Sequence, residues 1–347
     1  MIKVSIIGAT GYTGSELMRL LVHHPEVTLV HLTARQFAGK KISHVFPFLT
    51  GHLDKQTFVE LDVEQIKQDS DLVFICLPHG HAMSLTQALS TTDLKVIDMG
   101  ADFRIKQIES FETYYQVEQT APELLSKAVY GLSELYRDEI KEATLIANPG
   151  CFVTNALLAL IPAVKANLIE TKSIIIDSKT GVSGAGRSAN VAHLLSELGN
   201  SFKAYNPFTH RHIPEIEQEL NQLSDELVQV QFTPHLLPTE RGIFSTIYAK
   251  VQPGVTANDI RSIYQHHYQK EPFVHVLEEG QLPNLKDVRG TNHCQLQVQL
   301  DERTSRLVIL SIIDNLGKGA SGQAVQNLNI MFGLNETTGL TQVALVP

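Results

Sequence analysis

The chain has 347 residues and a formal net charge of −9. This length is enough for two domains with a large buried core, and the acidic balance argues against a protein that binds nucleic acid. Three cysteines, Cys76, Cys151 and Cys294, are too few and too scattered for a disulfide framework or a structural zinc site. We therefore expect no metal, no membrane partner and a cytoplasmic location, because no signal peptide or long apolar span is present either.

The first half of the sequence alternates short β-branched runs with helical runs. A helix is expected at 14–23, where Leu17, Leu20 and Leu21 recur at helical spacing. The expected strands are 4–7, 27–32, 72–77, 95–99 and 143–147. Strands that alternate with helices predict an α/β fold with a doubly wound parallel sheet of the Rossmann type.

A glycine-rich loop follows the first strand and opens the first helix. Its pattern is Gly-x-x-Gly-x-x-Gly, which differs from the commoner dinucleotide fingerprint. Glycines in this place let backbone amides approach a pyrophosphate at a helix N-terminus. The loop predicts a dinucleotide site formed by Gly8, Thr10, Gly11, Tyr12, Thr13 and Gly14.

The end of the second strand indicates which nicotinamide cofactor is used. NAD-specific folds usually place an acidic residue there, whereas this chain has Arg35. A guanidinium is suited to a 2′-phosphate, so the residue predicts NADP(H). Pro78, at the end of the third strand, is expected to pass near the dinucleotide because the carboxyl ends of parallel strands line the cofactor crevice.

Cys151 lies between the strand-like run 143–147 and a helical run that we expect from about Asn155. The N-terminus of a helix favours a thiolate over a thiol, so Cys151 is the candidate nucleophile. Cys76 and Cys294 lie within apolar strands and are expected to be structural.

After Cys151 the strands follow one another with fewer helices between them. The expected strands are 173–179, 228–233, 243–251, 293–300 and 306–313. Such a succession predicts an α+β domain with a mixed or antiparallel sheet. A helical tail at 319–332 is expected to return to the first domain, which gives a nucleotide-binding domain of 1–150 and 315–347 and a catalytic and oligomerisation domain of 151–314.

Four motifs occur together in one order along the chain. They are the loop 8–14, Asn148-Pro149-Gly150-Cys151, the stretch His210-Arg211-His212-Ile213-Pro214-Glu215-Ile216, and the stretch 314–320. The chain resembles the N-acetyl-gamma-glutamyl-phosphate reductase family over essentially its whole length. The wider superfamily includes aspartate-semialdehyde dehydrogenase and glyceraldehyde-3-phosphate dehydrogenase, whose fold is then expected here. The family usually has Tyr-Pro after the cysteine, where this chain has Phe152-Val153.

The resemblance implies an NADPH-dependent reduction of N-acetyl-L-glutamyl 5-phosphate to N-acetyl-L-glutamate 5-semialdehyde in arginine biosynthesis. Cys151 would displace phosphate to form a thioester, which hydride then reduces. We expect His212 to act as general acid and base because the pKa of histidine lies near neutrality, with His210 as the alternative or as a substrate ligand.

The substrate and the nicotinamide need further polar groups. By similarity to the acyl-phosphate dehydrogenases, Arg104 and Asn148 are candidates to bind the departing phosphate. Glu215 is expected to orient an imidazole or bind the acetamido group. Other candidates are Arg187 and Arg241 for anions, and Ser183, Gly184 and Asn315 for the nicotinamide.

Other functions stay open from the residues alone. A related dehydrogenase could act on N-acetyl-aminoadipyl or aspartyl phosphate, because one methylene in a pocket changes binding by only ~1–3 kcal/mol. A non-catalytic NADP-binding sensor is the third alternative. The family is usually dimeric or tetrameric, so a homodimer or homotetramer is expected.

Overall fold

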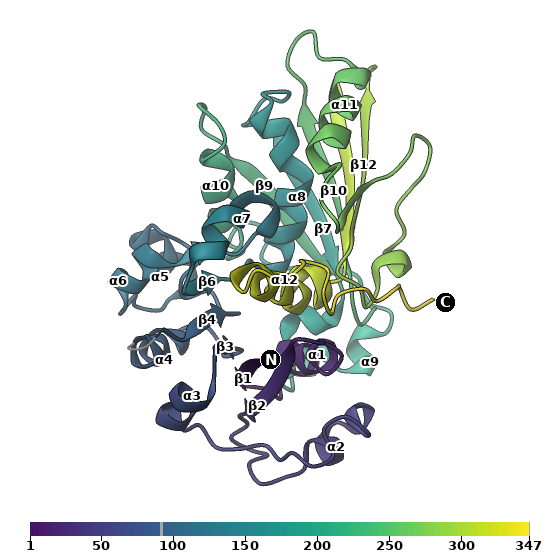
Figure 1. Cartoon of the computed structure of the whole chain (residues 1–347). Helices are drawn as coiled ribbons and strands as arrows, with labels where there is room; N and C mark the ends of the chain where they lie inside the picture. Colours follow the sequence, from purple (N-terminus) through teal and green to yellow (C-terminus); the bar gives the residue numbers. More distant parts are fainter. Residues whose placement is uncertain (91–92, 347) are drawn as a thin grey trace. The chain divides into compact units, whose positions relative to one another are not determined.

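The computed structural model describes residues 1–90 and 93–346 and divides them into two compact units (Figure 1). The first unit comprises residues 1–149 and 320–341, and the second comprises 150–319 and the segment from 342 onward. From the sequence, the C-terminal segment was expected in the first domain. In the structure the segment from 342 onward groups with the second unit, where the Leu345 N–H donates to the carbonyl of Arg289 at 3.2 Å. Among the described residues, no helix has the length and apolar character needed to cross a bilayer.

The first unit is built on a six-stranded sheet in the order β2-β1-β3-β4-β6-β5, and every neighbouring pair is parallel. Its strands are β1 (Ile2–Ile7), β2 (Val27–Leu32), β3 (Leu72–Ile75), β4 (Lys95–Asp98), β5 (Val129–Tyr130) and β6 (Leu145–Ala147). Its helices are α1 (Tyr12–Leu21), α2 (Ile42–Val45), α3 (Val63–Asp69), α4 (Ala82–Leu89), α5 (Ile108–Tyr115), α6 (Pro122–Lys127), α7 (Ser133–Glu142) and α12 (Gly322–Met331).

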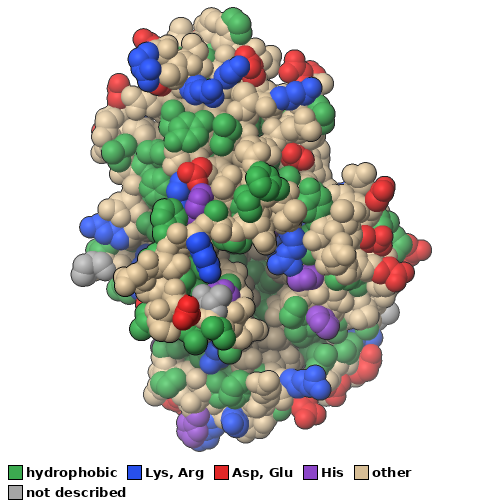
Figure 2. Space-filling model, turned by 180° about the vertical axis from the view of Figure 1, so that it is seen from behind, with side chains coloured by type: hydrophobic (Ala, Val, Ile, Leu, Met, Phe, Trp, Pro, Cys, Tyr) green, Lys and Arg blue, Asp and Glu red, His purple; other side chains and the backbone are tan. Residues whose placement is uncertain are grey.

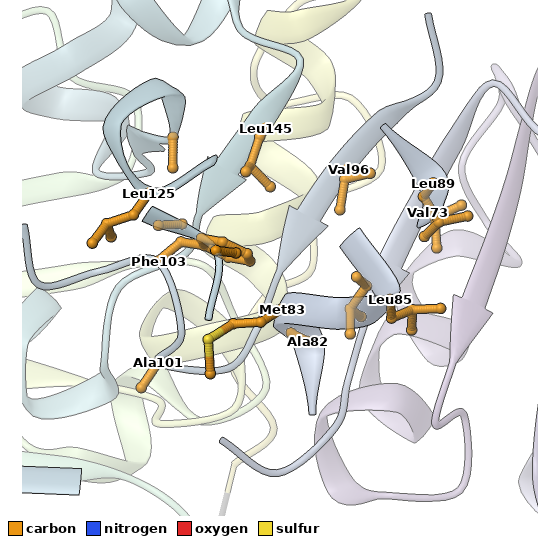
Figure 3. Packing of buried hydrophobic residues seen from close by; sticks show 14 of the residues in the cluster. Val73, Ala82, Met83, Leu85, Leu89, Val96, Ala101, Phe103, Leu125 and Leu145 are labelled. Carbon is orange, nitrogen blue, oxygen red and sulfur yellow. The ribbon is translucent and has the colours of Figure 1, made fainter. Parts of the chain in front are cut away.

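Burial on both faces explains the parallel sheet of the first unit. All four residues of β3 are buried, which is typical of strands covered by helices on both sides. On one side, apolar residues of α4 pack with those of the strands and of the segment that follows β4 (Figure 3). Met83 and Leu85 of α4, Val96 of β4 and Phe103 lie in this cluster. The expected doubly wound sheet is confirmed.

The second unit is built on a seven-stranded mixed sheet in the order β11-β12-β13-β10-β7-β9-β8. Its strands are β7 (Ile174–Thr180), β8 (Lys203–Ala204), β9 (Val230–Leu236), β10 (Ile243–Lys250), β11 (Val274–Val276), β12 (Cys294–Asp301) and β13 (Arg306–Ile313). The pairs β7–β9 and β11–β12 are parallel and the others are antiparallel. The unit's helices are α8 (Cys151–Lys165), α9 (Leu195–Leu198), α10 (Ile213–Asn221) and α11 (Ala257–Tyr268).

The two faces of this mixed sheet differ in their covering. Alternate residues of β7, β10 and β13 are buried on the face that contacts α8, α10 and α11. The residues between them are only partly buried. We call this opposite surface the open sheet face. Its two central rows are Ile175, Tyr248 and Val308, and Asp177, Thr246 and Leu310. Figure 2, which shows the molecule turned by 180° from the view of Figure 1, has hydrophobic side chains scattered among charged and other ones.

Several boundaries differ from the sequence-based expectation. Helix α8 begins at Cys151 rather than near Asn155, because the Thr154 N–H already donates to the Gly150 carbonyl at 2.9 Å. The strands β5, β8 and β11 were not predicted, since they have only two or three residues each. The predicted tail helix begins with a π-helical turn at Gly317–Ser321 and continues as α12.

Helix α12 is buried along its entire length, although it carries four carboxamide side chains. Asn327 Nδ2 donates to the Gly131 carbonyl at 2.8 Å and to Asn148 Oδ1 at 3.1 Å, and its Oδ1 accepts from the Ser133 hydroxyl at 2.8 Å. Gln323 Nε2 also donates to the Gly131 carbonyl. Buried amides are tolerated when they are hydrogen-bonded, so this network ties α12 to the rest of the first unit.

Candidate active site

Cys151 is the first residue of α8, and Gly150 is the N-cap. The backbone amides of a first helical turn have no acceptor within the helix and stabilise nearby negative charge. Gly150 has no side chain that could cap the helix, but the Gly150 N–H donates to Glu215 Oε1 at 2.9 Å. The sequence placed the nucleophile just before a helix, whereas the structure places it within the first turn.

His212 lies directly against the turn that carries the nucleophile. A Cβ added to Gly150 would lie 2.5 Å from His212 Nε2, so only glycine leaves room for the imidazole. His212 is the N-cap of α10, and Pro214 in the first turn pre-forms the helix. The histidine motif thus lies against the turn that carries Cys151, within one unit, and the catalytic roles of these residues stay predictions.

His210 lies beside His212, with ring centroids 4.8 Å apart. Its Nδ1 accepts the backbone N–H of His212 at 3.1 Å, which leaves the ring proton of the neutral form on Nε2. Burial, reinforced by the charge of Arg211, lowers the pKa of His210 to about 4. His210 is therefore neutral at physiological pH. The ring of Phe152 contacts both imidazoles, at centroid distances of 5.6 and 5.9 Å.

Tyr205 is a further polar residue of this site that the sequence did not reveal. Its ring centroid lies 5.6 Å from that of His210. Burial raises the pKa of Tyr205, and the negative charge of Cys151 raises it further. The residue lies outside the histidine motif, after the two-residue strand β8, so no spacing pattern could assign it.

A second polar cluster surrounds Asp314, which is completely buried. Asp314 Oδ1 accepts from Arg241 Nε at 3.1 Å and Nη2 at 3.0 Å, and Oδ2 accepts from the Gly290 N–H at 2.6 Å. A carboxylate with several donors holds a guanidinium firmly. The structure therefore places Arg241, a predicted anion ligand, in an internal ion pair with a partner that the sequence analysis did not single out.

Asn315 joins two loops of the same cluster. Its Nδ2 donates to the Ser183 hydroxyl at 3.0 Å, and its Oδ1 accepts from the Gly242 N–H at 2.7 Å. Gly184 lies beside Asn315, because a Cβ added to Gly184 would lie 3.9 Å from Asn315 Nδ2. This cluster meets the nucleophile at Gly319, where an added Cβ would lie 3.0 Å from the Cβ of Cys151. Arg187 lies farther along an exposed loop.

The glycine loop of the first unit forms the start of α1. Gly8 has φ +82°, and a side chain there would collide with the Cys76 carbonyl. The N–H of Gly8 donates to the Thr33 hydroxyl at 3.2 Å, and the N–H of Ala9 donates to the Thr33 carbonyl at 3.0 Å. The amides of these two residues are thus satisfied internally. The lack of a side chain at Gly8 allows the ends of β1 and β3 to lie close together, and the Gly8 N–H does not point to a ligand but donates to Thr33.

The first turn of α1, formed by Tyr12, Thr13 and Gly14, suits an anionic ligand. Gly11 is the N-cap, no side chain caps it, and no acidic residue occupies the first turn. Helix N-termini of this kind bind phosphate groups. The residues present therefore fit the pyrophosphate of a dinucleotide. Thr10 precedes this turn in the same loop.

Arg35 lies in the turn after β2 and is exposed. It forms no hydrogen bond or ion pair with any residue in the described ranges 1–90 and 93–346. Its guanidinium is thus available to an anion at the end of β2. Pro78, at the end of β3, is also exposed, as a residue lining a crevice would be.

Two buried carboxylates lie near the end of β4: Asp98 is its last residue, and Asp102 follows it. Asp102 accepts from the N–H groups of Gly80 at 2.7 Å and Ala82 at 2.9 Å, so it fixes the start of α4. Burial, and then the charge of Asp102, raises the pKa of Asp98 to about 7. Arg104 is 7% exposed and its Nη2 donates to the Met99 carbonyl at 2.8 Å. This predicted phosphate ligand is thus largely enclosed by its own unit.

Asn148 is 1% exposed and both ends of its side chain are bonded. Its Nδ2 donates to the Ala320 carbonyl at 3.1 Å, and its Oδ1 accepts from Asn327. These contacts hold the strand end to α12. They favour a structural role over the phosphate-binding role expected from the resemblance.

Cys76 differs from Cys151 in its surroundings. Burial raises the pKa of the Cys76 thiol to about 12, despite a hydrogen bond with Thr13. Such a thiol is not a nucleophile at neutral pH. In the described part of the chain, no three His, Cys, Asp or Glu side chains are grouped so that they could hold a metal ion.

Comparison with known proteins agrees with this arrangement. Residues 3–143 match the semialdehyde dehydrogenase NAD binding domain, and residues 151–315 match the semialdehyde dehydrogenase dimerisation domain. The N-acetyl-gamma-glutamyl-phosphate reductase of Pelotomaculum thermopropionicum is 55% identical over 100% of this chain and 99% of its own length. The chain belongs to the N-acetyl-gamma-glutamyl-phosphate reductase family. The reductase of the same name from Desulforamulus reducens is 50% identical over the full length of both chains.

Solved structures share the fold of this reductase family member at low sequence identity. Aspartate semialdehyde dehydrogenase with NADP from Candida albicans has a TM-score of 0.74 and 16% identity, and covers 96% of this chain and 99% of its own. Aspartate semialdehyde dehydrogenase II from Vibrio cholerae has a TM-score of 0.70 and 17% identity, and covers 96% and 98%. The expected dehydrogenase fold is confirmed, and the chain is an oxidoreductase with a nicotinamide-binding domain.

Proposed function

We propose that this chain reduces N-acetyl-L-glutamyl 5-phosphate to N-acetyl-L-glutamate 5-semialdehyde and releases phosphate, in the synthesis of arginine. The observation that supports this most directly is Cys151 in the first turn of α8 with the His212 ring against Gly150. The relatives that carry the reductase name match this chain from end to end, which supports the same substrate.

The reaction begins at the sulfur of Cys151. The thiolate attacks the acyl carbon, a C–S bond forms, and the C–O bond to phosphate breaks, so phosphate leaves and a thioester remains. The amides at the start of α8 and the α8 dipole stabilise the thiolate before attack. The thioester stays electrophilic, which a carboxylate would not be.

Hydride addition to the thioester gives a thiohemiacetal on Cys151, which collapses to the aldehyde as the C–S bond breaks and the sulfur leaves as a thiolate. A nicotinamide bound at the proposed site would supply that hydride. His212 is proposed to take the proton of the thiol, to give it to the alkoxide that hydride addition forms, and to remove it again as the thiohemiacetal collapses, so that the proton can return to the sulfur. His210, neutral and with its Nδ1 committed to the His212 N–H, is proposed to hold the turn and donate through Nε2.

We also propose that the cofactor is NADP(H). The first turn of α1 is the proposed site of the pyrophosphate, and Arg35 is proposed to bind the 2′-phosphate. Ser183, Gly184 and Asn315 are proposed for the nicotinamide. Arg187 and Arg241 remain proposed anion ligands.

The chain is further proposed to form a homodimer or a homotetramer. The open sheet face leaves Ile175, Tyr248 and Val308 partly exposed in a single row across three strands. An apolar row with polar neighbours is typical of a self-associating surface. The description of the matched family as a dimerisation domain supports a second copy of this chain as the partner.

Replacement of the nucleophile tests the reaction. We expect Cys151→Ser to lower kcat by on the order of 10³-fold or more, because the substitution removes the nucleophile of the acyl transfer. Cys76→Ser should retain activity within about threefold, because the Cys76 thiol is protonated. The assay is phosphate-dependent reduction of NADP with N-acetylglutamate semialdehyde, its adipate homologue and aspartate semialdehyde. Intact-protein mass spectrometry of the quenched wild type should show an acyl adduct on Cys151.

The same assay separates the alternatives. A preference for the adipate homologue or for aspartate semialdehyde would assign the related dehydrogenase reactions instead. NADP binding without turnover of any of the three aldehydes would make the chain a sensor. Activity that survives the loss of the Cys151 thiol would reject the thioester route.

A further inference from the structure

Two helices of the second unit begin next to each other, and neither has a conventional side-chain cap. The N-cap of α8 is Gly150, which has no side chain, and the N-cap of α10 is His212, whose side chain makes no capping bond. Both N-cap N–H groups are nevertheless bonded. Gly150 N–H donates to Glu215 Oε1 at 2.9 Å, and His212 N–H donates to His210 Nδ1 at 3.1 Å.

The source of each acceptor is unusual. In a capping box, a Glu at the third helical position reaches back to the N-cap N–H of its own helix. Glu215 occupies that position in α10, yet its carboxylate bonds the N-cap of α8. The corresponding residue of α8 is Val153, which has no acceptor. Glu215 of α10 therefore supplies the acceptor for the N-cap N–H of α8. His210 supplies the acceptor for the N-cap N–H of α10.

We propose that Glu215 is a positioning residue that holds the first turn of α8, and with it Cys151, in register with His212. This role rests on the proposed function of Cys151 and His212, and it differs from the two roles expected from the sequence, which were to orient an imidazole or to bind the acetamido group. The bond joins the nucleophile's helix to the histidines' helix at one buried point.

Burial makes this bond effective. Glu215 is 0% exposed, so water does not compete for its carboxylate or for the Gly150 N–H. The packing beside it is close as well, because a Cβ added to Gly150 would lie 2.5 Å from His212 Nε2. A shift of α8 relative to α10 would separate the sulfur from the imidazole, and a misplacement of ~1 Å costs on the order of 10²-fold in rate.

The Gly150 amide can be observed on its own. The sequence contains two Pro-Gly pairs, Pro149-Gly150 and Pro253-Gly254. With ¹³C′-proline and ¹⁵N-glycine labels, a two-dimensional HNCO spectrum of the full chain gives only these two cross-peaks. Gly254 lies in an exposed turn and serves as the internal reference. A hydrogen bond to a carboxylate moves the amide proton of Gly150 downfield.

Three variants form a matched set. Glu215→Ala removes the acceptor, Glu215→Gln keeps an Oε1 acceptor without the charge, and Glu219→Ala removes a carboxylate of equal burial one turn later on α10. We expect an upfield shift of the Gly150 proton by about 1 ppm or more in Glu215→Ala, a smaller shift in Glu215→Gln and none in Glu219→Ala.

Kinetics complete the test. Glu215→Ala should lower kcat and the iodoacetamide alkylation rate of Cys151 together, kcat by on the order of 10²-fold, with the KM for NADPH unchanged. Glu215→Gln should recover most of both, and Glu219→Ala should keep both. An unmoved Gly150 peak in Glu215→Ala, or a Glu215→Gln variant as impaired as Glu215→Ala, overturns the proposal. If the wild type turns over no acyl phosphate, the proposed function fails, while the Gly150 shift and the alkylation rate still decide the role of Glu215.

Discussion

Gly150 has close neighbours on three sides. A Cβ added to it would lie 2.5 Å from His212 Nε2, its N–H donates to Glu215, and its carbonyl accepts from Thr154. The sequence predicted Cys151 as nucleophile from the strand–turn–helix junction and named Glu215 within the histidine motif. It revealed neither the contact of Glu215 with Gly150 nor Tyr205, because these depend on the crossing of α10 and α8 and on the path of the chain after β8.

Three of the ligands predicted from the sequence have bonding partners within their own unit. Asn148, Arg104 and Arg241 were expected to bind phosphate or another anion. Each bonds a group of its own unit: the Ala320 carbonyl, the Met99 carbonyl and the Asp314 carboxylate. Residue type and position after a strand do not reveal such internal partners. Their roles toward the substrate stay predictions.

Arg35 carries the prediction of cofactor preference. Because its exposed guanidinium has no partner within residues 1–90 and 93–346, Arg35→Ala should remove a charge-assisted bond to the 2′-phosphate. Such bonds contribute ~1.5–3 kcal/mol, so the KM for NADPH should rise by roughly 10- to 100-fold. The KM for NADH, which lacks that phosphate, is the internal control and should change less than twofold. Equal increases for both cofactors would remove Arg35 from the 2′-phosphate site.

Among the elements, long strands were predictable and short ones were not. The strands expected at 173–179, 243–251 and 306–313 agree with β7, β10 and β13, because each is a run of seven or eight residues rich in β-branched and other apolar side chains. The edge strands β8 and β11 have two and three residues, too few to show a period. The sequence analysis did not place the start of the helix at Cys151, because Val153 and Thr154 are β-branched and favour strands over helices.

The open sheet face predicts self-association. Thr246 lies at its centre, between Asp177 of β7 and Leu310 of β13. A charge at this position would be desolvated in a dimer, so Thr246→Glu should shift the wild-type oligomer toward monomer in a sedimentation-velocity concentration series.

The matched control is Gln265→Glu, which places the same side chain at an exposed position on α11. Helix α11 packs with α8 and β12 on the covered side of the sheet. This variant should sediment as the wild type does. A monomeric wild type at micromolar concentration, or a Thr246→Glu variant that assembles normally, would show that the open sheet face is not the contact between copies.

For the molecule as a whole, Asp98 links stability to pH. Its pKa is about 7 in the folded chain because of burial and the charge of Asp102, against 3.8 for an ordinary aspartate. Between these two pH values, Asp98 holds a proton in the folded state that it has lost in the unfolded state. The stability that protonated Asp98 contributes to the folded state is therefore complete below pH 3.8 and is lost as pH rises toward 7. The change is at most ~1.4 kcal/mol per pH unit.

Asp98→Asn, which mimics the protonated carboxyl, isolates this contribution. Relative to the wild type, the variant should become progressively more stable from pH 4 to pH 8 in urea titrations, while ionisations elsewhere cancel in the difference. Asp138→Asn, at an exposed position on α7, should show a constant difference. A stability difference for Asp98→Asn that does not change with pH would contradict the buried ionisation.

The last helix of the first unit comes from the far end of the chain, and this has a consequence for biosynthesis. Gly131, Ser133 and Asn148 all bond to Asn327, which leaves the ribosome long after them. The first unit therefore stays incomplete until α12 has been synthesised, by which time residues 150–319 of the second unit have already left the ribosome. Folding of the nucleotide-binding unit must wait for the chain that lies between its two parts.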